Sequence, residues 1–500
     1  MITTSKMRAL EINSEAFGVS TLQLMENAGR SVADEIEREV EVKNSKVVIF
    51  VGHGGKGGDG LVAGRHLSER GAKVEIVLLG EIKHKDSVTN LQSILDMDFS
   101  VSLRNFEEVE GLDLNGDVLV DAMLGTGVRG KIREPFKSAI KLFNQLRGFK
   151  VSIDVPSGLD PDTGKDLGES VKPDLVVTFH DMKQGLLRTD FKVVVKRIGI
   201  PPEASLYAGP GDLMVNLKPR EMKSKKGIGG RVLVVGGSET FSGAPTLSAL
   251  SSLRTGADLV YVASPERTAE IISSYSPDLI TIKLEGRNFN EKNVEQLTQW
   301  VEKANVVVFG PGLGLSEDAV RATPTFVEHV LKMGKPLVLD ADGLKIMKGS
   351  KLSRNVVITP HPGEFKIYFG TEPSASERER IEQVMDKARE CNCVVLLKGY
   401  LDVISDGTSF KLNKAGNPGM TAGGTGDTLT GIVATFVAQG IDPFTSAYMG
   451  ALVNSLAGTL AYSELGPHIT ASDIVQKIPA VLSNPIEAFK KRVYKRVITS

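Results

Sequence analysis

The residues best suited to chemistry form a glycine-rich run that ends in an acidic residue, Gly423-Gly424-Thr425-Gly426-Asp427. Glycines just before a predicted helix leave backbone N–H groups free to bind an anion, so we expect Gly424, Thr425 and Gly426 to form an anion hole. Asp427, in the first turn of that helix, can accept the proton of an attacking hydroxyl. The run predicts phosphoryl transfer with Asp427 as the base. An N-capping aspartate would explain Asp427 alone and would leave the glycines unexplained.

A second group of loops with suitable chemistry lies in the first half of the chain. Residues 52–60 are mostly glycine and lie between a predicted strand and a predicted helix. They fit neither a P-loop nor a specific Rossmann spacing, and a flexible turn is the alternative interpretation. Residues 121–130 and 154–160 also follow predicted strands. Because ligands of open α/β sheets bind at the carboxyl ends of strands, we expect these loops to share one site.

Short apolar strands alternate with amphipathic helices in both halves of the chain, which predicts two α/β domains with mainly parallel sheets. In the first half we expect helices at 5–17, 20–42, 59–70 and 135–146, and strands at 46–51, 73–79, 117–122, 151–155 and 175–179. In the second half we expect strands at 231–235, 259–263, 279–283, 306–309, 336–339, 356–358 and 394–397, then buried helices at 426–439 and 443–465.

A stretch rich in proline and glycine separates the two series. The segments Gly199-Ile200-Pro201-Pro202 and Ala208-Gly209-Pro210-Gly211 can neither continue a helix nor lie in the middle of a sheet. We therefore expect a first domain at 1–207, a linker at 208–222 and a second domain at 223–493.

The composition excludes several other classes of protein. The 60 basic and 61 acidic residues give a formal net charge of -1, so no net field draws the chain to nucleic acid or to an anionic membrane. We expect small-molecule substrates instead. Residues 1–17 resemble neither a signal peptide nor a membrane anchor, which predicts a cytoplasmic protein. We interpret the two cysteines, Cys391 and Cys393, as buried structural residues without a disulfide framework.

The three loops of the first half together resemble the NAD(P)H-hydrate epimerase domain over about residues 1–205. The resemblance implies interconversion of the R and S forms of the hydrates NADHX and NADPHX, with Asp154 as an acid–base group. Inversion at a hydroxyl-bearing carbon requires proton movement, although capping of a turn is the alternative role for Asp154. The residues implied to line this site are Gly55, Lys56, Gly57, Gly58, Asp59, Gly125, Thr126, Gly127, Val128, Arg129, Gly130, Lys131 and Asp154.

The same resemblance implies a potassium site, and this sequence departs from its pattern. Relatives bind K⁺ through an Asn in the first loop, an Asp at the position of Asp121 and a Ser at the position of Ser157. Lys56 stands where that Asn usually lies. Its ammonium group can replace the cation rather than coordinate it. The sequence leaves open whether K⁺ binds at Lys56, Asp121 and Ser157.

The second half resembles the ADP- or ATP-dependent NAD(P)H-hydrate dehydratase branch of the ribokinase-like family over about residues 212–493. The resemblance rests on the run at 423–427 together with Lys226-Gly227, Gly236-Gly237-Ser238, and residues 310–314, 340–343, 359–364 and 398–402. It implies phosphorylation of the C6 hydroxyl of the S hydrate, followed by loss of phosphate. With ADP as donor the products are AMP and phosphate, and Mg²⁺ is expected at the phosphates. The choice between ADP and ATP stays open.

This resemblance also assigns site residues by position. Taken alone, His361 would more often be a turn residue between two prolines than a ligand. The implied contacts to the hydrate are Ala257, Gly312, Leu313, Gly314, His361 and Asp427, and those to the nucleotide are Lys398, Gly399, Tyr400, Leu401, Asp402 and Gly426.

Together the two resemblances predict one repair enzyme with an isomerase and a lyase activity. The predicted fold class is an N-terminal Rossmann-like α/β/α sandwich followed by a C-terminal ribokinase-like α/β/α domain, and the family implies a homo-oligomer. The alternative is a vitamin or sugar kinase of the ribokinase family with a non-catalytic N-terminal binding or scaffold domain. A stable phosphorylated product would distinguish the kinase from the repair enzyme.

Overall fold

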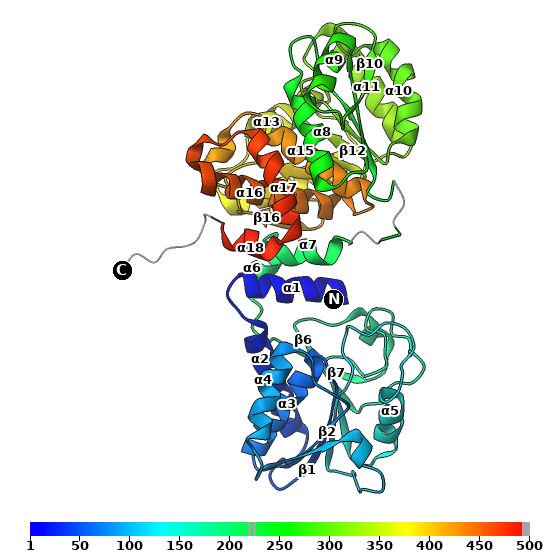
Figure 1. The fold of residues 1–500 in the computed structure, drawn as a ribbon, viewed down its shortest axis with the longest axis vertical. Coiled ribbons are helices and arrows are strands. Elements are labelled where there is room, and N and C mark those ends of the chain that lie inside the picture. The colour runs from blue at the N-terminus through cyan, green and yellow to red at the C-terminus, as the bar shows by residue number, and fades with distance from the viewer. Residues whose placement is uncertain (219–221, 224–226, 493–500) are drawn as a thin grey trace, which may run out of the picture. The chain divides into compact units, whose positions relative to one another are not determined.

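The computed structural model describes residues 1–218, 222–223 and 227–492. The chain divides into two compact units, Met1–Ala204 and Ser205–Ser500, and each contains its own sheet (Figure 1). Lys226 of the predicted second-domain motif, residues 219–221 of the predicted linker and residue 493 lie outside the described residues. Within the described residues, every helix is too short or too polar to cross a membrane.

The first unit contains a seven-stranded sheet in the order β3-β2-β1-β4-β5-β6-β7, in which all neighbours run parallel. Its strands are β1 (Lys46–Val51), β2 (Lys73–Leu78), β3 (Val101–Asn105), β4 (Val118–Ala122), β5 (Phe149–Ile153), β6 (Leu175–Phe179) and β7 (Lys192–Lys196). Its helices are α1 (Thr4–Ala16), α2 (Thr21–Glu39), α3 (Gly55–Glu69), α4 (Lys85–Leu95), α5 (Phe136–Gln145) and the 3₁₀ helices η1 (Phe106–Glu108) and η2 (Gln184–Arg188).

Alternate residues of β1 pack on opposite faces of this sheet, as the period of a strand requires. Val47 and Ile49 belong to the core covered by α2 and α3, whereas Val48 and Phe50 lie in the core under α5. The ring of Phe50 meets that of Phe143 in α5 edge to face, with centroids 5.4 Å apart. The unit is therefore an α/β/α sandwich, with α2, α3 and α4 on one side and α5 on the other (Figure 1). This confirms the predicted fold class.

The glycine run after β1 is the start of a helix packed closely against the sheet. Helix α3 begins at Gly55, four residues earlier than predicted. A Cβ atom on Gly57 would lie 2.0 Å from the backbone oxygen of Gly52, and one on Gly60 would lie 2.4 Å from the Cβ of Ala122. Glycine is therefore required here by close packing.

The second unit contains a nine-stranded sheet in the order β10-β9-β8-β11-β12-β13-β14-β15-β16. The sheet is parallel from β10 to β14, and β15 and β16 form an antiparallel hairpin at one edge. Its strands are β8 (Arg231–Val235), β9 (Leu259–Pro265), β10 (Ile280–Leu284), β11 (Val306–Phe309), β12 (Leu337–Leu339), β13 (Val356–Ile358), β14 (Val394–Leu397), β15 (Asp402–Ser405) and β16 (Phe410–Asn413).

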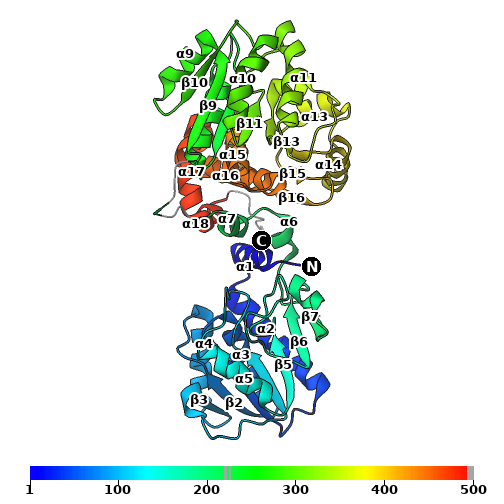
Figure 2. The same ribbon diagram turned by 90° about the vertical axis from the view of Figure 1, so that its right-hand side faces the viewer.

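Helices cover both faces of the second sheet (Figure 2). Residues of α10, α11 and α14 pack into one core, as Val301, Phe326 and Ala388 illustrate. Helices α8, α15 and α16 contact strands of the same sheet and one another. The helices of this unit are α7 (Pro210–Asn216), α8 (Gly243–Thr255), α9 (Glu266–Tyr275), α10 (Glu291–Lys303), α11 (Glu317–Lys332), α12 (Ala341–Ile346), α13 (Pro362–Phe369), α14 (Glu377–Cys391), α15 (Thr425–Ala438), α16 (Pro443–Leu465), α17 (Ala471–Ser483), α18 (Pro485–Lys490) and the 3₁₀ helices η3 (Pro418–Thr421) and η4 (Gly466–His468), while α6 (Pro202–Leu206) lies at the division between the units.

Two further differences from the sequence expectation concern the stretch between the domains and the two cysteines. The Pro- and Gly-rich stretch contains two short helices, because Pro202 and Pro210 take first helical positions, where the missing N–H is not needed. Cys391 and Cys393 are joined in a disulfide, contrary to our expectation. Asn392 between them has a left-handed backbone (φ 54°), which turns the chain so that the two Cα atoms lie 5.4 Å apart.

The close packing of α3 gives a stability prediction. Gly60→Val should lower the free energy of unfolding of the first unit by at least about 2 kcal/mol, because the new side chain overlaps β4. Gly127→Val is the matched control, since a Cβ atom there meets nothing within 4 Å. Denaturant unfolding of the two full-length variants measures the effect. Equal stability of the two variants would contradict the packing argument.

Two candidate active sites

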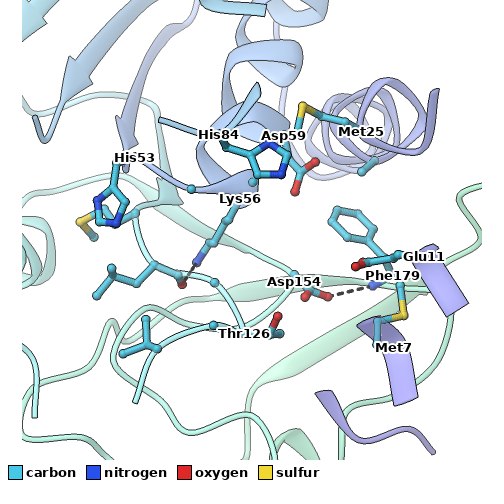
Figure 3. A pocket seen from close by; sticks show the side chains of 18 of the residues that line it. Met7, Glu11, Met25, His53, Lys56, Asp59, His84, Thr126, Asp154 and Phe179 are labelled. Atoms are coloured by element: carbon cyan, nitrogen blue, oxygen red, sulfur yellow. Dashed lines mark hydrogen bonds between the residues drawn. The ribbon is translucent and has the colours of Figure 1, made fainter. Parts of the chain in front are cut away.

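A cavity of about 560 Å³ opens at the carboxyl edge of the first sheet (Figure 3). It is lined by residues of α1 and α3 and by the loops after β4 and β5. Of the residues predicted for this site, the lining includes Gly55, Lys56, Asp59, Gly125, Thr126, Gly127, Val128, Lys131 and Asp154. The others do not line it: Gly57 and Gly58 are buried in α3, and Arg129 and Gly130 are exposed.

Lys56 has its ammonium group buried among four oxygen atoms. Its Nζ donates to Asp121 Oδ2 (3.0 Å), to Ser157 Oγ (3.1 Å), and to the backbone oxygens of Leu124 (3.2 Å) and Val155 (2.7 Å). The side chains of Lys56 and Asp121 are 3% and 0% exposed. The structure thus brings together Lys56, Asp121 and Ser157, the three residues of the potassium site that the sequence left open.

This oxygen cage does not fit a potassium ion while Lys56 is present, because the ammonium already occupies its centre. Burial lowers the pKa of Lys56, and the carboxylate of Asp121 opposes that shift. A buried charge requires such a partner, since an unpaired one would be strongly destabilising. The ammonium therefore supplies the positive charge that links the loops after β4 and β5.

Asp154 is held firmly at the end of β5. Its backbone is left-handed (φ 59°), a conformation that aspartate tolerates better than most residues. Its Oδ1 accepts hydrogen bonds from Lys183 Nζ (2.5 Å), Thr178 Oγ1 (3.0 Å) and the backbone N–H of Phe179 (3.3 Å). No interaction at Oδ2 is found among the described residues, and Asp154 lines the cavity (Figure 3). One oxygen is therefore fixed and the other is available to a ligand.

Two more carboxyl groups, Glu11 and Asp59, line the same cavity (Figure 3). Burial raises the pKa of Glu11 to about 7, Asp154 adds to the rise, and Lys183 opposes it. Burial also raises the pKa of Asp59 well above its usual value, again with a contribution from Asp154. The cavity thus combines an ion-paired carboxylate with two carboxyl groups that retain protons more strongly, which is an arrangement suited to acid–base chemistry.

A cavity of about 900 Å³ lies in the second unit, beside the N-terminus of α15. The predicted residues that line it are His361, Lys398, Gly399, Tyr400, Asp402, Gly424, Thr425, Gly426 and Asp427. Leu401 lines a neighbouring cavity of about 370 Å³, together with Lys398, Gly399 and Tyr400. Neither cavity is lined by Ala257, Gly312, Leu313 or Gly314.

The predicted anion hole and base lie in the first turn of α15. Gly424 is the N-cap, with a left-handed backbone (φ 89°) that favours glycine. The first N–H groups of a helix have no intrahelical partner and attract negative charge. Burial raises the pKa of Asp427 to about 7, Asp340 adds to the rise, and Lys398 opposes it. Asp427 can therefore take up a proton near neutral pH.

Lys398 connects this turn to the end of β12. Its Nζ lies 3.2 Å from Asp340 Oδ1 and 3.8 Å from Glu364 Oε2. Burial works against the charge, but these carboxylates raise the pKa of Lys398 above its usual value. A Cβ atom on Gly426 would lie 3.2 Å from Nζ, so Lys398 lies close to the backbone of this turn. Lys398 thus places a positive charge directly against the helix N-terminus.

His361 and Asp402 have clear structural partners. His361 caps α13, because its Nδ1 accepts hydrogen bonds from the N–H groups of Gly363 (3.0 Å) and Glu364 (3.4 Å). Its side chain is 54% exposed, and Nε2 lies 3.3 Å from Glu364 Oε1. Asp402 accepts hydrogen bonds from Asn413 (2.7 Å) and from the N–H of Gly399 (2.9 Å), while burial raises its pKa to about 6. Both residues border the second cavity.

Sequence reasoning missed two charged residues of the first site. Glu11 lies on α1, where the sequence pattern predicted a helix but no site residue. Lys183 precedes η2 and has a side chain that is 0% exposed. A buried lysine has no distinct local sequence signal, because its partner Asp154 is distant along the chain.

Comparisons with known proteins identify the family of this chain. A family model for NAD(P)H-hydrate dehydratase matches residues 232–480, and one for the YjeF-related protein N-terminus matches residues 21–185. Proteins named bifunctional NAD(P)H-hydrate repair enzyme match over nearly the full chain. The one from Hyperthermus butylicus is 42% identical, covering 99% of this chain and 95% of the relative. Those from Pyrobaculum aerophilum (96% and 98% covered) and Methanothermobacter thermautotrophicus (95% and 94%) are each 44% identical. The chain belongs to the family of bifunctional NAD(P)H-hydrate repair enzymes, with an epimerase domain followed by a dehydratase domain.

Proposed function

We propose that the first cavity is the epimerase site and that Asp154 exchanges protons at C6 of the hydrated nicotinamide ring. The fixed Oδ1 and the available Oδ2 of Asp154 support this role. In this proposal the hydroxyl leaves one face of C6 and water adds to the other, and both events move protons. We take the epimerase domain as residues 1–207, the linker as 208–222 and the dehydratase domain as 223–493.

For the second cavity we propose that Asp427 removes the proton of the C6 hydroxyl of the S hydrate. The hydroxyl oxygen then attacks the terminal phosphorus of the nucleotide, while N–H groups at 424–426 and Lys398 stabilise the charge on the moving phosphoryl group. The lone pair of the ring nitrogen expels phosphate to give a C6=N1 iminium, and loss of a proton from C5 to solvent then restores NADH or NADPH. The observation that carries this proposal is the position of Asp427 in the first turn of α15, in a cavity shared with Lys398.

A nucleotide with Mg²⁺ fits the chemistry of this cavity. Among the described residues, no three His, Cys, Asp or Glu side chains converge as a metal cage. Mg²⁺ needs only one or two carboxylates beside phosphate oxygens and water. Asp340 and Glu364, which line the cavity, would hold it, and the ion would neutralise phosphate charge. We propose ADP as the donor, with AMP and phosphate as products.

Two further expectations belong to this proposal. We propose a cytoplasmic enzyme, in line with the expectation from the sequence. We also propose a homo-oligomer, which light scattering of the purified chain would test.

The direct test is repair of a mixture of R and S NADHX with ADP and Mg²⁺. We expect complete recovery of NADH, measured by its absorbance, with one AMP and one phosphate formed per NADH. Recovery of only the S share would reject the epimerase function. A stable phosphorylated product would instead support the vitamin or sugar kinase.

The pKa of Asp427 predicts a pH dependence of dehydration. A base must be ionised, so kcat/KM for the S hydrate should rise with pH through about 7. Asp427→Asn should lower kcat by about 10²- to 10⁴-fold and abolish this rise. A wild-type profile that is flat between pH 5 and pH 8 would argue against Asp427 as the base.

The same pKa predicts a stability effect whose sign can be derived. The folded-state value lies above the ordinary value of 3.8, so wild type loses stability as the pH rises from about 4 to about 7. Asp427→Asn lacks this ionisation. The variant should therefore gain stability relative to wild type between pH 4 and pH 8 in thermal unfolding. A stability difference between Asp427→Asn and wild type that stays constant from pH 4 to pH 8 would contradict the raised pKa of Asp427.

Lys56 predicts a potassium requirement that can be introduced by mutation. Lys56→Asn should make epimerisation depend on K⁺, because the shorter side chain leaves the oxygen cage without its cation. Lys56→Met, which removes the charge and offers no oxygen, is the control and should not be rescued by K⁺. Epimerisation rates with and without K⁺ provide the measurement. Equal rates for wild type and Lys56→Asn under both conditions would refute this role of Lys56.

A further inference from the structure

Three carboxyl groups, Glu11, Asp59 and Asp154, line the first cavity, and their surroundings differ. Asp154 forms a buried ion pair with Lys183. Within the described residues, no hydrogen bond or ion pair of the Glu11 side chain is found, although the residue is partly buried. A carboxyl group that lines a cavity without a protein partner is available to a ligand.

The chain fixes Glu11 in the cavity wall through both ends of α1. The backbone N–H of Ile2 donates to the oxygen of Met182 (2.9 Å), next to Lys183. Thr4 donates from its backbone N–H and its hydroxyl to Asp162 (2.9 and 2.7 Å). At the other end, Asn13 donates to the backbone oxygen of Ala204 (3.1 Å). These contacts hold α1 against the loop that carries Lys183.

Met7 and Glu11 are one helical turn apart, so both point into the cavity from the same face of α1 (Figure 3). Glu11 therefore reaches the cavity from α1, whereas Asp154 reaches it from the end of β5 and Asp59 from α3 (Figure 3). A ring bound in this cavity would have carboxyl groups from different elements around it.

The charges of the cavity give these carboxyl groups different protonation states. When two carboxyl groups share a site, one keeps its proton more strongly. The ammonium of Lys183 forms an ion pair with the carboxylate of Asp154. Glu11 lies in the field of that charge with no cation in contact, and burial together with Asp154 raises its pKa to about 7. At neutral pH a substantial fraction of Glu11 holds a proton.

We propose that Glu11 is a further catalytic residue of the epimerase, the general acid that works together with Asp154 as the general base. This inference rests on the epimerase function proposed above.

The reaction then balances without any redox partner. The Glu11 carboxyl gives its proton to the C6 hydroxyl, the C6–O bond breaks, and the lone pair of N1 forms a C6=N1 iminium as water leaves. A water molecule attacks C6 from the opposite face, its proton passes to Asp154, and the C=N electron pair returns to N1. Proton transfer from Asp154 to Glu11 restores the starting state. The configuration at C6 is inverted, and the C6 oxygen of the product comes from solvent.

Charged groups from several elements lie near Glu11. They are Arg8 on the same helix, Asp154 and Lys183, and Asp59 on α3. Lys56, His53 and His84 also line the cavity. An acid must hold its proton, so wild-type kcat/KM for epimerisation should fall as the pH rises through about 7.

The test measures conversion of purified R NADHX to the S form without nucleotide, so that dehydration does not interfere. Glu11→Gln should lower kcat by about 10²- to 10⁴-fold, leave KM within about threefold and remove the alkaline decline. Glu11→Asp should retain part of the activity together with the decline. Glu15→Gln, an exposed acid four residues later on the same helix, is the matched control and should behave as wild type.

Labelled water gives an independent readout of the same steps. In H₂¹⁸O the wild-type enzyme should introduce one ¹⁸O at C6 per inversion, and Glu11→Gln should slow exchange and inversion equally. Thermal unfolding of Glu11→Gln at wild-type temperature or above verifies that the variant is folded.

Several results would overturn the inference. These are a Glu11→Gln rate within about threefold of wild type, an alkaline decline that persists in Glu11→Gln, or a decline that disappears only in Asp59→Asn. If wild type interconverts the epimers while any of these holds, the epimerase function stands and only the role of Glu11 fails. A wild-type chain that does not interconvert them would reject both.

Discussion

Burying the ammonium group of Lys56 costs desolvation free energy that only nearby oxygens can offset. The cage of Asp121, Ser157 and two backbone oxygens provides that compensation and draws together loops that follow two different strands. The pattern recurs at the buried Lys183, which pairs with Asp154, and at the partly buried Lys398, which pairs with Asp340. In each case the carboxylate lies at the carboxyl end of a parallel strand or just after it. These ion pairs hold residues at the carboxyl edges of the two sheets, where the two cavities open.

The lysine positions also decide which carboxyl groups can act as acids and which as bases. A carboxylate in contact with an ammonium keeps its charge, whereas one that is buried near another carboxylate holds a proton. In the first cavity Asp154 is in contact with the ammonium of Lys183, whereas Glu11 is buried near Asp154 and has a raised pKa. In the second, Asp340 takes the contact with Lys398, and Asp427 is left with a pKa of about 7. Both sites thus obtain acid–base groups near neutrality from the same physical arrangement.

Much of this arrangement could be predicted from sequence because it is encoded locally. The buried central strands, such as Lys46–Val51, are continuous apolar runs, and the glycine run before Asp427 is specific. The strands Val101–Asn105 and Lys192–Lys196 were not predicted, because edge strands with exposed residues lack that run. The disulfide depends on one left-handed residue, Asn392, which periodicity does not indicate. Glu11 and Lys183 could not be found because the residues that surround them in the cavity are distant along the chain, and only folding brings them together.

The central claim is that the two cavities are the two active sites, and a crystal structure of the full chain with NADH and AMP would test it most directly. We predict the nicotinamide ring of a dinucleotide in the first cavity, with a ring atom within about 3.5 Å of Asp154 or Glu11. We also predict the AMP phosphate at the N-terminus of α15, beside Lys398. A first cavity left without dinucleotide, or AMP bound away from Asp427, would contradict the account.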